Sequence, residues 1–139
     1  RLVREESTPE TGEKKEELTP IPQEVIFNAR NEIAAIHTSE AIEAYLVDVV
    51  FATRYPERYS EELKNWVEVG ASPRGGIGLD KCSRAHAWLK GRDFVTPEDV
   101  RAVVHNVLRH RLILSYEASA EGIGPDRVIK EIMAQVAVP

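Results

Sequence analysis

The sequence of 139 residues contains a single cysteine, Cys82, and no long apolar run. One cysteine excludes an internal disulfide and a cysteine-based zinc site, and it fits a reducing, cytoplasmic setting. No segment approaches the roughly 20 apolar residues of a membrane span, so we expect no membrane contact. Positive charge is not in excess either, because 18 Lys and Arg oppose 23 Asp and Glu for a net charge of −5. This balance argues against a surface for nucleic acid.

Catalytic motifs are equally scarce. A phosphate-binding loop requires G-x-x-x-x-G-K-[ST], and although Gly70 and Gly75 have the glycine spacing, Gly76 and Ile77 follow them. No β-rich run ends in the Asp-Glu pair that would bind magnesium. The four histidines lack H-E-x-x-H spacing, and the carboxylates form no acid–base pair. The sequence therefore predicts no metal site and no ATP hydrolysis by this chain alone.

The composition changes near residue 21. Residues 1–21 are acidic and polar and include the run Glu13-Lys14-Lys15-Glu16-Glu17, so we expect a flexible linker or tail. Residues 22–139 are predicted to form one helical domain. Because the first residue is Arg1 and not methionine, we also expect the protein to continue upstream.

Apolar residues recur at helical spacing along the whole second segment. Five helices are predicted: from Pro22 through Ile36, from Thr38 or Ser39 to near Tyr55, from Pro73 to about Lys90, from Thr96-Pro97 through Leu108, and from Gly124-Pro125 through Val136. The predicted inward positions are Ile26, Ala29, Ile33 and Ile36 in the first helix, Leu79, Cys82, His86 and Leu89 in the third, and Val100, Val103, Val104, Val107 and Leu108 in the fourth. Residues 109–114 either finish the fourth helix or form a short strand. The prediction is an all-α fold, a small helical bundle with at most a short strand pair.

One helix start departs from the others in its charge. Ser72 and Pro73 read as N-cap and first helical residue, which places Arg74 in the first turn, where the helix dipole disfavours a cation. The helix starts at Pro97 and Pro125 are followed by acids at this place, and Asp99 stands at the capping-box position after Thr96. Arg74 is either a solvated arginine with a small penalty or a ligand for an anion at the helix start. In the second case Gly75 and Gly76 would let the backbone approach that anion, or another domain, closely.

The longer segment from residue 70 to residue 122 resembles the C-terminal lid domain of the MoxR family of AAA+ ATPases. The matching strings are Gly70-Ala71-Ser72-Pro73-Arg74, residues 91–100 (GRDFVTPEDV) and residues 107–112 (VLRHRL). The tail GIGPDRVIKEIM, residues 122–133, is similar to the closing helix of that family. The resemblance extends from about Pro22 to the end of the chain, and it implies the helical fold of an AAA+ lid.

The resemblance also implies a role for Arg74. It stands where the family has its sensor-2 arginine, which contacts the γ-phosphate of ATP, with Pro73 beside it. ATP and magnesium would be bound mainly by a core domain upstream of Arg1, so the intact parent is expected to be an ATPase. The implied setting is a hexameric, chaperone-like motor that remodels client proteins, with neighbouring subunits and von Willebrand factor A-domain proteins as partners.

Other interpretations stay open at this stage. A related possibility is the lid of a magnesium-chelatase ATPase subunit, although the strings "GASPR" and "LRHRL" favour MoxR. A different class is a stand-alone helix-turn-helix module over residues 72–108, against which the acidic balance counts. The basic cluster Arg109-His110-Arg111 either complements a helix C-terminus or contacts a subunit, the ATPase core or phosphate. His86 is expected to be packed or hydrogen-bonded to a partner.

Overall fold

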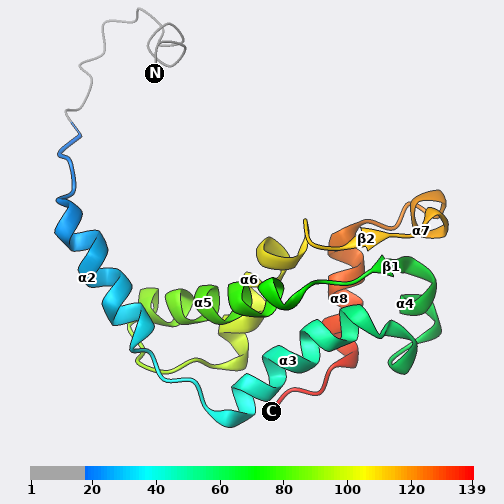
Figure 1. The fold of residues 1–139 in the computed structure, drawn as a ribbon, viewed down its shortest axis with the longest axis horizontal. Helices are drawn as coiled ribbons and strands as arrows, with labels where there is room; N and C mark the ends of the chain where they lie inside the picture. Colours follow the sequence, from blue (N-terminus) through cyan, green and yellow to red (C-terminus); the bar gives the residue numbers. More distant parts are fainter. Residues whose placement is uncertain (1–17) are drawn as a thin grey trace, which may run out of the picture.

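The structure is a computed structural model that describes residues 18–139. These residues form helices and one pair of short strands, which confirms the predicted small helical domain (Figure 1). The elements are α2 (Gln23–Ala34), α3 (Glu40–Arg54), the 3-10 helix η1 (Pro56–Arg58), α4 (Glu61–Trp66), β1 (Val67–Val69), α5 (Pro73–Leu89), α6 (Pro97–Leu108), β2 (Ile113–Leu114), α7 (Tyr116–Ala120) and α8 (Pro125–Gln135). Most of the predicted linker over residues 1–21 lies outside the described residues, so its flexibility stays a prediction.

Local chemistry sets the helix boundaries. The Ser39 hydroxyl accepts a hydrogen bond of 3.2 Å from the Ile42 backbone N–H, and Ser60 caps α4 through the Leu63 N–H at 3.0 Å. Gly91 ends α5 in the left-handed conformation, with a φ of +75°. The starts of α3, α5, α6 and α8 fall where the sequence predicts them.

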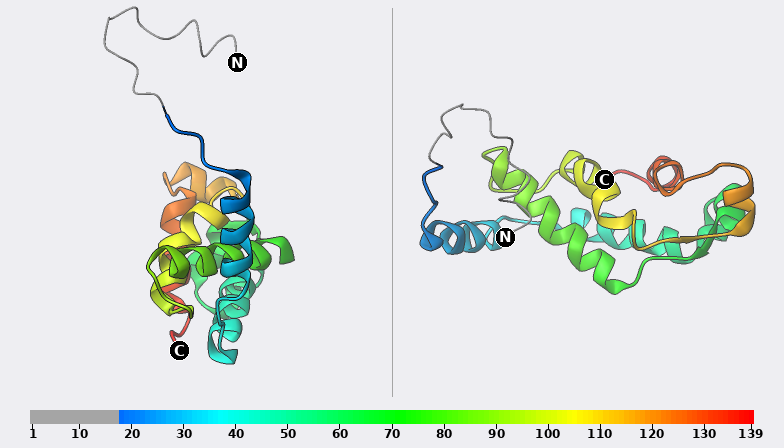
Figure 2. Two further views of the ribbon diagram at one scale, coloured as in Figure 1. Left: turned by 90° about the vertical axis from the view of Figure 1, so that its left-hand side faces the viewer. Right: turned by 90° about the horizontal axis from the view of Figure 1, so that it is seen from above.

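Helices α5 and α6 are antiparallel neighbours at the centre of the domain (Figures 1 and 2). Glycines allow their close approach. A Cβ atom on Gly75 would lie 3.2 Å from Leu108 Cδ2, and one on Gly78 would lie 3.1 Å from Val107 Cγ1. These distances are tighter than ordinary contacts, so a larger residue at either position would push the helices apart.

The predicted inward face of α5 is wrong at two positions. Cys82 is exposed and the Leu89 side chain is 74% exposed, whereas Leu79 is fully buried as predicted. The buried positions of α5 are Gly75, Leu79, Ser83 and Ala87, spaced four residues apart. The physical reason is that α6 packs along this line, where Gly75, Ser83 and Ala87 are small, so the larger apolar side chains of Cys82 and Leu89 beside it stay near solvent.

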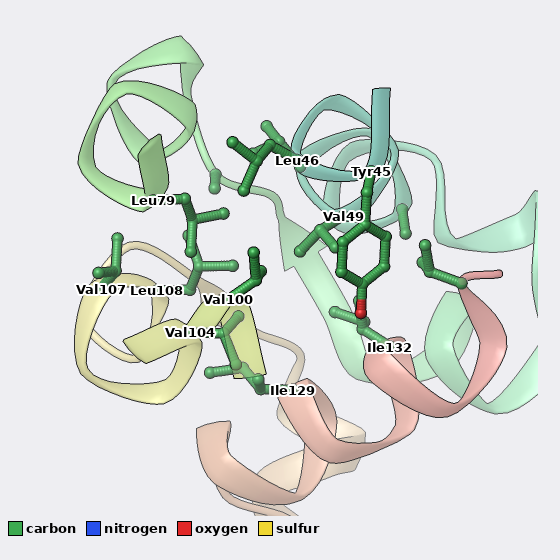
Figure 3. Close-up of a cluster of buried hydrophobic side chains, with 14 of the residues drawn as sticks. Tyr45, Leu46, Val49, Leu79, Val100, Val104, Val107, Leu108, Ile129 and Ile132 are labelled. Atoms are coloured by element: carbon green, nitrogen blue, oxygen red, sulfur yellow. The ribbon is translucent and has the colours of Figure 1, made fainter. Parts of the chain in front are cut away.

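The core joins α3, α5, α6 and α8 (Figure 3). Tyr45 and Val49 of α3 face Ile132 of α8, while Leu79 of α5 meets Leu108 of α6. The apolar residues predicted for the fourth helix are buried except for the half-buried Val103. This core fixes the orientation of α5 relative to its neighbours.

The two strands connect the middle of the chain to the segment after α6. β1 and β2 are antiparallel, with Val67 opposite Leu114 and Val69 opposite Ile113. The Ser115 backbone N–H donates to the Trp66 carbonyl at 2.8 Å and extends this connection. Of the two predictions for residues 109–114, the short strand is therefore correct for the last two residues.

Helix α2 lies at one end of an elongated molecule, opposite α4 and α7 (Figure 2). Its predicted apolar face is only partly covered, because Ile26 is 48% exposed and Ile36, just past the helix, is buried. Polar contacts join this segment to α5: Trp88 Nε1 donates to Glu32 Oε2 at 2.8 Å, and Arg84 donates to the Ile36 carbonyl.

Candidate functional site

The loop before α5 is fixed against the end of α3. A Cβ on Gly70 would lie 2.2 Å from the Thr53 carbonyl oxygen, so only glycine fits there. The Ala71 N–H donates to the buried Thr53 Oγ1 at 2.9 Å, and Arg54 Nη1 donates to the Ala71 carbonyl at 3.2 Å. These contacts hold the first residue of α5, Pro73, in a defined position.

Arg74 lies in the first turn of α5 and is exposed to solvent. The first turn contains no acidic residue, and the Ser72 hydroxyl makes no capping hydrogen bond. Within residues 18–139, Arg74 forms no ion pair and no side-chain hydrogen bond. The structure therefore places a cation that has no partner among the described residues at the positive end of a helix, as the sequence predicts.

The glycines after Arg74 have a different role from the one their sequence suggests. In the sequence they are suited to close approach by an anion or another domain, yet Gly75 is buried against α6 and the Arg111 stem. Gly76 faces α3 instead, where a Cβ atom on it would lie 3.7 Å from Val50 Cγ2. The close approach permitted by Gly75 is thus within the chain.

A shallow apolar hollow adjoins Pro73, between α3 and α5. Val47 and Ile77 line it and are 65% and 55% exposed. The complete lining is Glu43, Leu46, Val47, Pro73, Gly76, Ile77, Asp80 and Arg84. The apolar hollow, which Pro73 lines, therefore lies next to the positive charge of Arg74.

The cluster Arg109-His110-Arg111 is divided by the structure. Arg109 follows the last residue of α6 and its Nε donates to Asp126 Oδ1 at 2.8 Å, with His105 Nδ1 3.1 Å from the same oxygen. The arginine is the larger cause of a lowered pKa for the Asp126 carboxyl. Arg111 instead donates from Nε to the Val107 carbonyl at 3.2 Å. The two arginines therefore differ in charge compensation.

A buried ionic network joins the end of α5 to the start of α6. The fully buried Asp99 accepts two hydrogen bonds of 2.6 Å from Arg92, and His86 Nδ1 lies 2.6 Å from Asp99 Oδ1. The Thr96 N–H also donates to Asp99, at 2.7 Å, which completes the predicted capping box. Burial raises the pKa of Asp99, but the hydrogen bonds from Arg92, Thr96 and His86 outweigh it and hold this pKa far below its usual range.

The sequence predicts the capping box and a His86 that is either packed or hydrogen-bonded, and the structure shows the hydrogen-bonded case; the sequence does not predict the contact of Arg92. No motif marks this contact in the sequence, because Arg92 lies seven residues before Asp99 and outside its helix. The turn that brings the two together depends on the left-handed conformation of Gly91. The carboxylate of this network is inaccessible to a substrate, since Asp99 is fully buried. The network connects the end of α5 to the start of α6. The candidate functional site is instead the start of α5.

In residues 18–139, no three His, Cys, Asp or Glu side chains are grouped to hold a metal ion. No helix of this part is both long and apolar enough to cross a bilayer. What the start of α5 presents is binding chemistry for an anion, supplied by Arg74 and the helix N-terminus.

Comparison with known proteins agrees with the arrangement of these helices. The AAA lid domain family matches residues 63–132, half of the chain, and this match includes α5 and α6. The chaperone MoxR1 of Mycobacterium tuberculosis is 46% identical over 110 residues, which cover 78% of this chain and 29% of that protein. A magnesium-chelatase subunit ChlI of Nicotiana tabacum is 59% identical, but over only 39 residues, 28% of this chain and 9% of that protein.

A solved structure shares the fold. The crystal structure of a candidate ATPase from Cytophaga hutchinsonii matches with a TM-score of 0.76 and 41% identity, covering 78% of this chain and 33% of that one. The match thus spans about a third of the length of MoxR1 and of this ATPase. The family match, the MoxR1 similarity and the shared fold lead to one assignment: this chain belongs to the AAA lid domain family and is the lid of a MoxR-family AAA+ ATPase.

Proposed function

We propose that Arg74 is the sensor-2 arginine of this lid and contacts the γ-phosphate of ATP in the intact ATPase. The observation that carries the proposal is the exposed Arg74, without a partner among residues 18–139, in a first turn that the Gly70–Ser72 loop fixes to α3. A triphosphate would satisfy both the guanidinium and the helix N-terminus.

The residues at the start of α5 fit a nucleotide. Arg74 supplies planar, charged donors suited to phosphate oxygens, and Pro73 with the neighbouring hollow offers an apolar surface for a purine ring. Magnesium would neutralise phosphate charge when bound, and it would be held mainly by the core domain. This lid's own part is to orient the γ-phosphate and to exclude water from one side of the nucleotide.

The same contact provides a route for coupling. Arg74 interacts with the γ-phosphate before hydrolysis and loses that interaction once phosphate departs, so the lid orientation favoured with ATP is no longer stabilised. Because the Gly70–Ser72 loop is hydrogen-bonded to α3, displacement of Arg74 would move the whole lid and not a single side chain.

The wider function we propose is chaperone-like remodelling of client proteins by a cytoplasmic hexamer. Its support is the name of the relative MoxR1, a chaperone, together with the membership in the lid family. Partners would be the AAA+ core, neighbouring subunits and a von Willebrand factor A-domain protein. By this proposal the lid does not bind nucleic acid or membrane.

Two other functions have weaker support. A magnesium-chelatase-type lid is favoured only by a 39-residue similarity, far shorter than the 110 residues shared with MoxR1. A helix-turn-helix module needs a basic recognition helix, yet the net charge is −5. Specific binding of this chain to duplex DNA at physiological salt would favour the second.

The test is Arg74→Ala in the intact ATPase that carries this lid. We expect ATP turnover to fall about tenfold or more, because a hydrogen bond to a charged group contributes about 1.5–3 kcal/mol. Lid movement, followed by a pair of fluorophores on lid and core, should respond less to ATP.

The matched control is Arg101→Ala, which removes an exposed arginine of α6 that has no ion pair within residues 18–139. It should leave both readouts unchanged. Unchanged turnover together with unchanged lid movement in Arg74→Ala would refute the sensor-2 role.

A further inference from the structure

Arg111 lies along the first two turns of α5, although it follows α6 in the chain. Its Cδ would be 3.6 Å from a Cβ on Gly75, and its Nη2 would be 4.0 Å from a Cβ on Gly78. The side chain therefore extends from the first turn of α5 into the second. Positions 74 and 78 are four residues apart and share a helix face, so the Arg111 guanidinium flanks the face that carries Arg74.

The position of Arg111 is fixed by a neutral group. Its Nε donates to the Val107 carbonyl at 3.2 Å, and within residues 18–139 no carboxylate lies in ion-pair range of it. A carbonyl orients a guanidinium without compensating its charge. The contrast is Arg109, two residues earlier, whose Nε donates to Asp126 at 2.8 Å. Arg111 thus keeps both its full charge and its terminal donors.

Glycines provide the room for this arrangement. Gly75 and Gly78 carry no side chain on the flank where the Arg111 stem runs. Arg111 is half-buried there, so its carbon stem packs while its charged end stays accessible. Two arginines without acidic partners among residues 18–139 thereby share one end of α5 in a chain of net charge −5. Like charges placed together repel, and a multivalent anion removes that repulsion.

We infer that Arg111 is a second phosphate-binding residue of the lid, which binds the triphosphate next to the phosphate held by Arg74. The inference rests on the proposed function, which brings ATP to the start of α5. Phosphate suits the geometry because a guanidinium presents paired donors to phosphate oxygens. Arg74 leads from the first turn, and Arg111 reaches the same anion from the side of α6.

The test compares two arginines of one cluster in the intact ATPase. Arg111→Met keeps the stem over the glycines and removes the charge, and Arg109→Met makes the same change at the arginine paired with Asp126. We expect Arg111→Met to weaken binding of a non-hydrolysable ATP analogue and of inorganic tripolyphosphate about tenfold. Arg109→Met should bind both as the unaltered ATPase does.

A conservative variant separates binding from packing. Arg111→Lys retains the stem and the charge and loses the Nε donor to Val107, so it should recover most of the affinity. Thermal unfolding of each variant reports whether the lid is folded. If Arg111→Met does not fold, Arg111→Lys and Arg111→Gln replace it, and the charged variant should bind tripolyphosphate more tightly than the neutral one.

Several outcomes would overturn the inference. Equal affinities in Arg111→Met and Arg109→Met would do so, and a loss in Arg74→Ala alone would then leave the sensor-2 role intact. A defect of Arg111→Met in subunit assembly with unchanged tripolyphosphate binding would identify a carboxylate across an interface as the partner. A loss in Arg111→Met with unchanged Arg74→Ala would refute the sensor-2 role and leave Arg111 as the phosphate-binding residue.

Discussion

Helices α5 and α6 differ in how the charges and N–H groups of their first turns are satisfied. At α6, Thr96 and Asp99 cap the helix, and Asp99 also pairs with Arg92 and contacts His86. At α5, the Ser72 hydroxyl makes no cap and Arg74 has no partner among the described residues. Both starts carry a serine or threonine followed by proline, so the difference lies in what comes next.

The difference shows how stability and binding are distributed. The α6 start has its charges satisfied internally and joins two helices, whereas the α5 start is held from outside by a loop on α3. A helix start whose N–H groups and charges are satisfied within the chain has no free groups with which to bind a ligand. One that is positioned but electrostatically unsatisfied is suited to bind an anion.

The largest expected effect on stability comes from removing the ion pair at the start of α6. Asp99→Asn removes the carboxylate that pairs with Arg92 and contacts His86, and leaves a cation beside a buried site. Because breaking a buried ion pair is strongly destabilising, the free energy of unfolding should fall by about 3 kcal/mol. Urea unfolding of the chain at neutral pH measures it.

Acid provides the internal check on Asp99→Asn. The native pKa of Asp99 is far below its usual value, so near pH 4 the unfolded chain takes up the proton first and the native state does not. The stability due to Asp99 is present above that pH and is lost as pH falls toward the native pKa. The difference between the two proteins should therefore shrink below about pH 4. A difference independent of pH would assign the loss to packing.

A smaller effect tests how the α5 start is held. Gly70→Ala would place a Cβ 2.2 Å from the Thr53 carbonyl oxygen, so the loop or the end of α3 must shift. We expect unfolding to become easier by about 2 kcal/mol, in the range for overpacking. The lid's response to ATP should weaken as well, because Arg74 moves with the loop.

Gly76→Ala is the matched control for Gly70→Ala. Its Cβ would lie 3.7 Å from Val50 Cγ2, an ordinary contact, and alanine favours a helix over glycine by about 1 kcal/mol. This variant should be more stable than the unaltered chain in the same urea measurement. Equal losses in both variants would contradict the view that the loop is fixed against α3.

Helix starts were predictable because their chemistry is local. Pro73, Pro97 and Pro125 begin helices as expected, and the capping box at Asp99 was predicted from four consecutive residues. The resemblance over residues 70–122 likewise led to the lid fold, which the family match confirms.

What the sequence could not supply depends on long-range packing. Cys82 and Leu89 fit the apolar periodicity of a helix, but α6 packs on the face of α5 that carries the small residues Ser83 and Ala87. The partial exposure of α2 also depends on which neighbours cover it. The contacts of Arg92 and Arg111 join separate elements, so no spacing rule for a single helix predicts them.

The smallest expected effect on stability comes from giving the first turn of α5 the acidic charge found in α6. Arg74→Glu puts an acid in the first turn of α5, as Glu98 does in α6. Arginine and glutamate have similar helix propensities, so the change in stability reports electrostatics. We expect the chain to gain about 1 kcal/mol at low salt, measured by urea unfolding, since an acid replaces a cation at the positive end of the helix.

The gain in stability should coincide with a loss of function. High salt screens charges at an exposed helix end, so the stabilisation by Arg74→Glu should decline in about 1 M salt, while Asp99→Asn, at a buried site, should keep its effect. In the intact ATPase the same Arg74→Glu change should weaken ATP binding more than Arg74→Ala, because it adds repulsion to a lost contact. A variant that is more stable and binds ATP normally would contradict the role of Arg74. A more stable lid that binds ATP poorly would indicate that Arg74 lowers the stability of α5 and is needed for binding the anion.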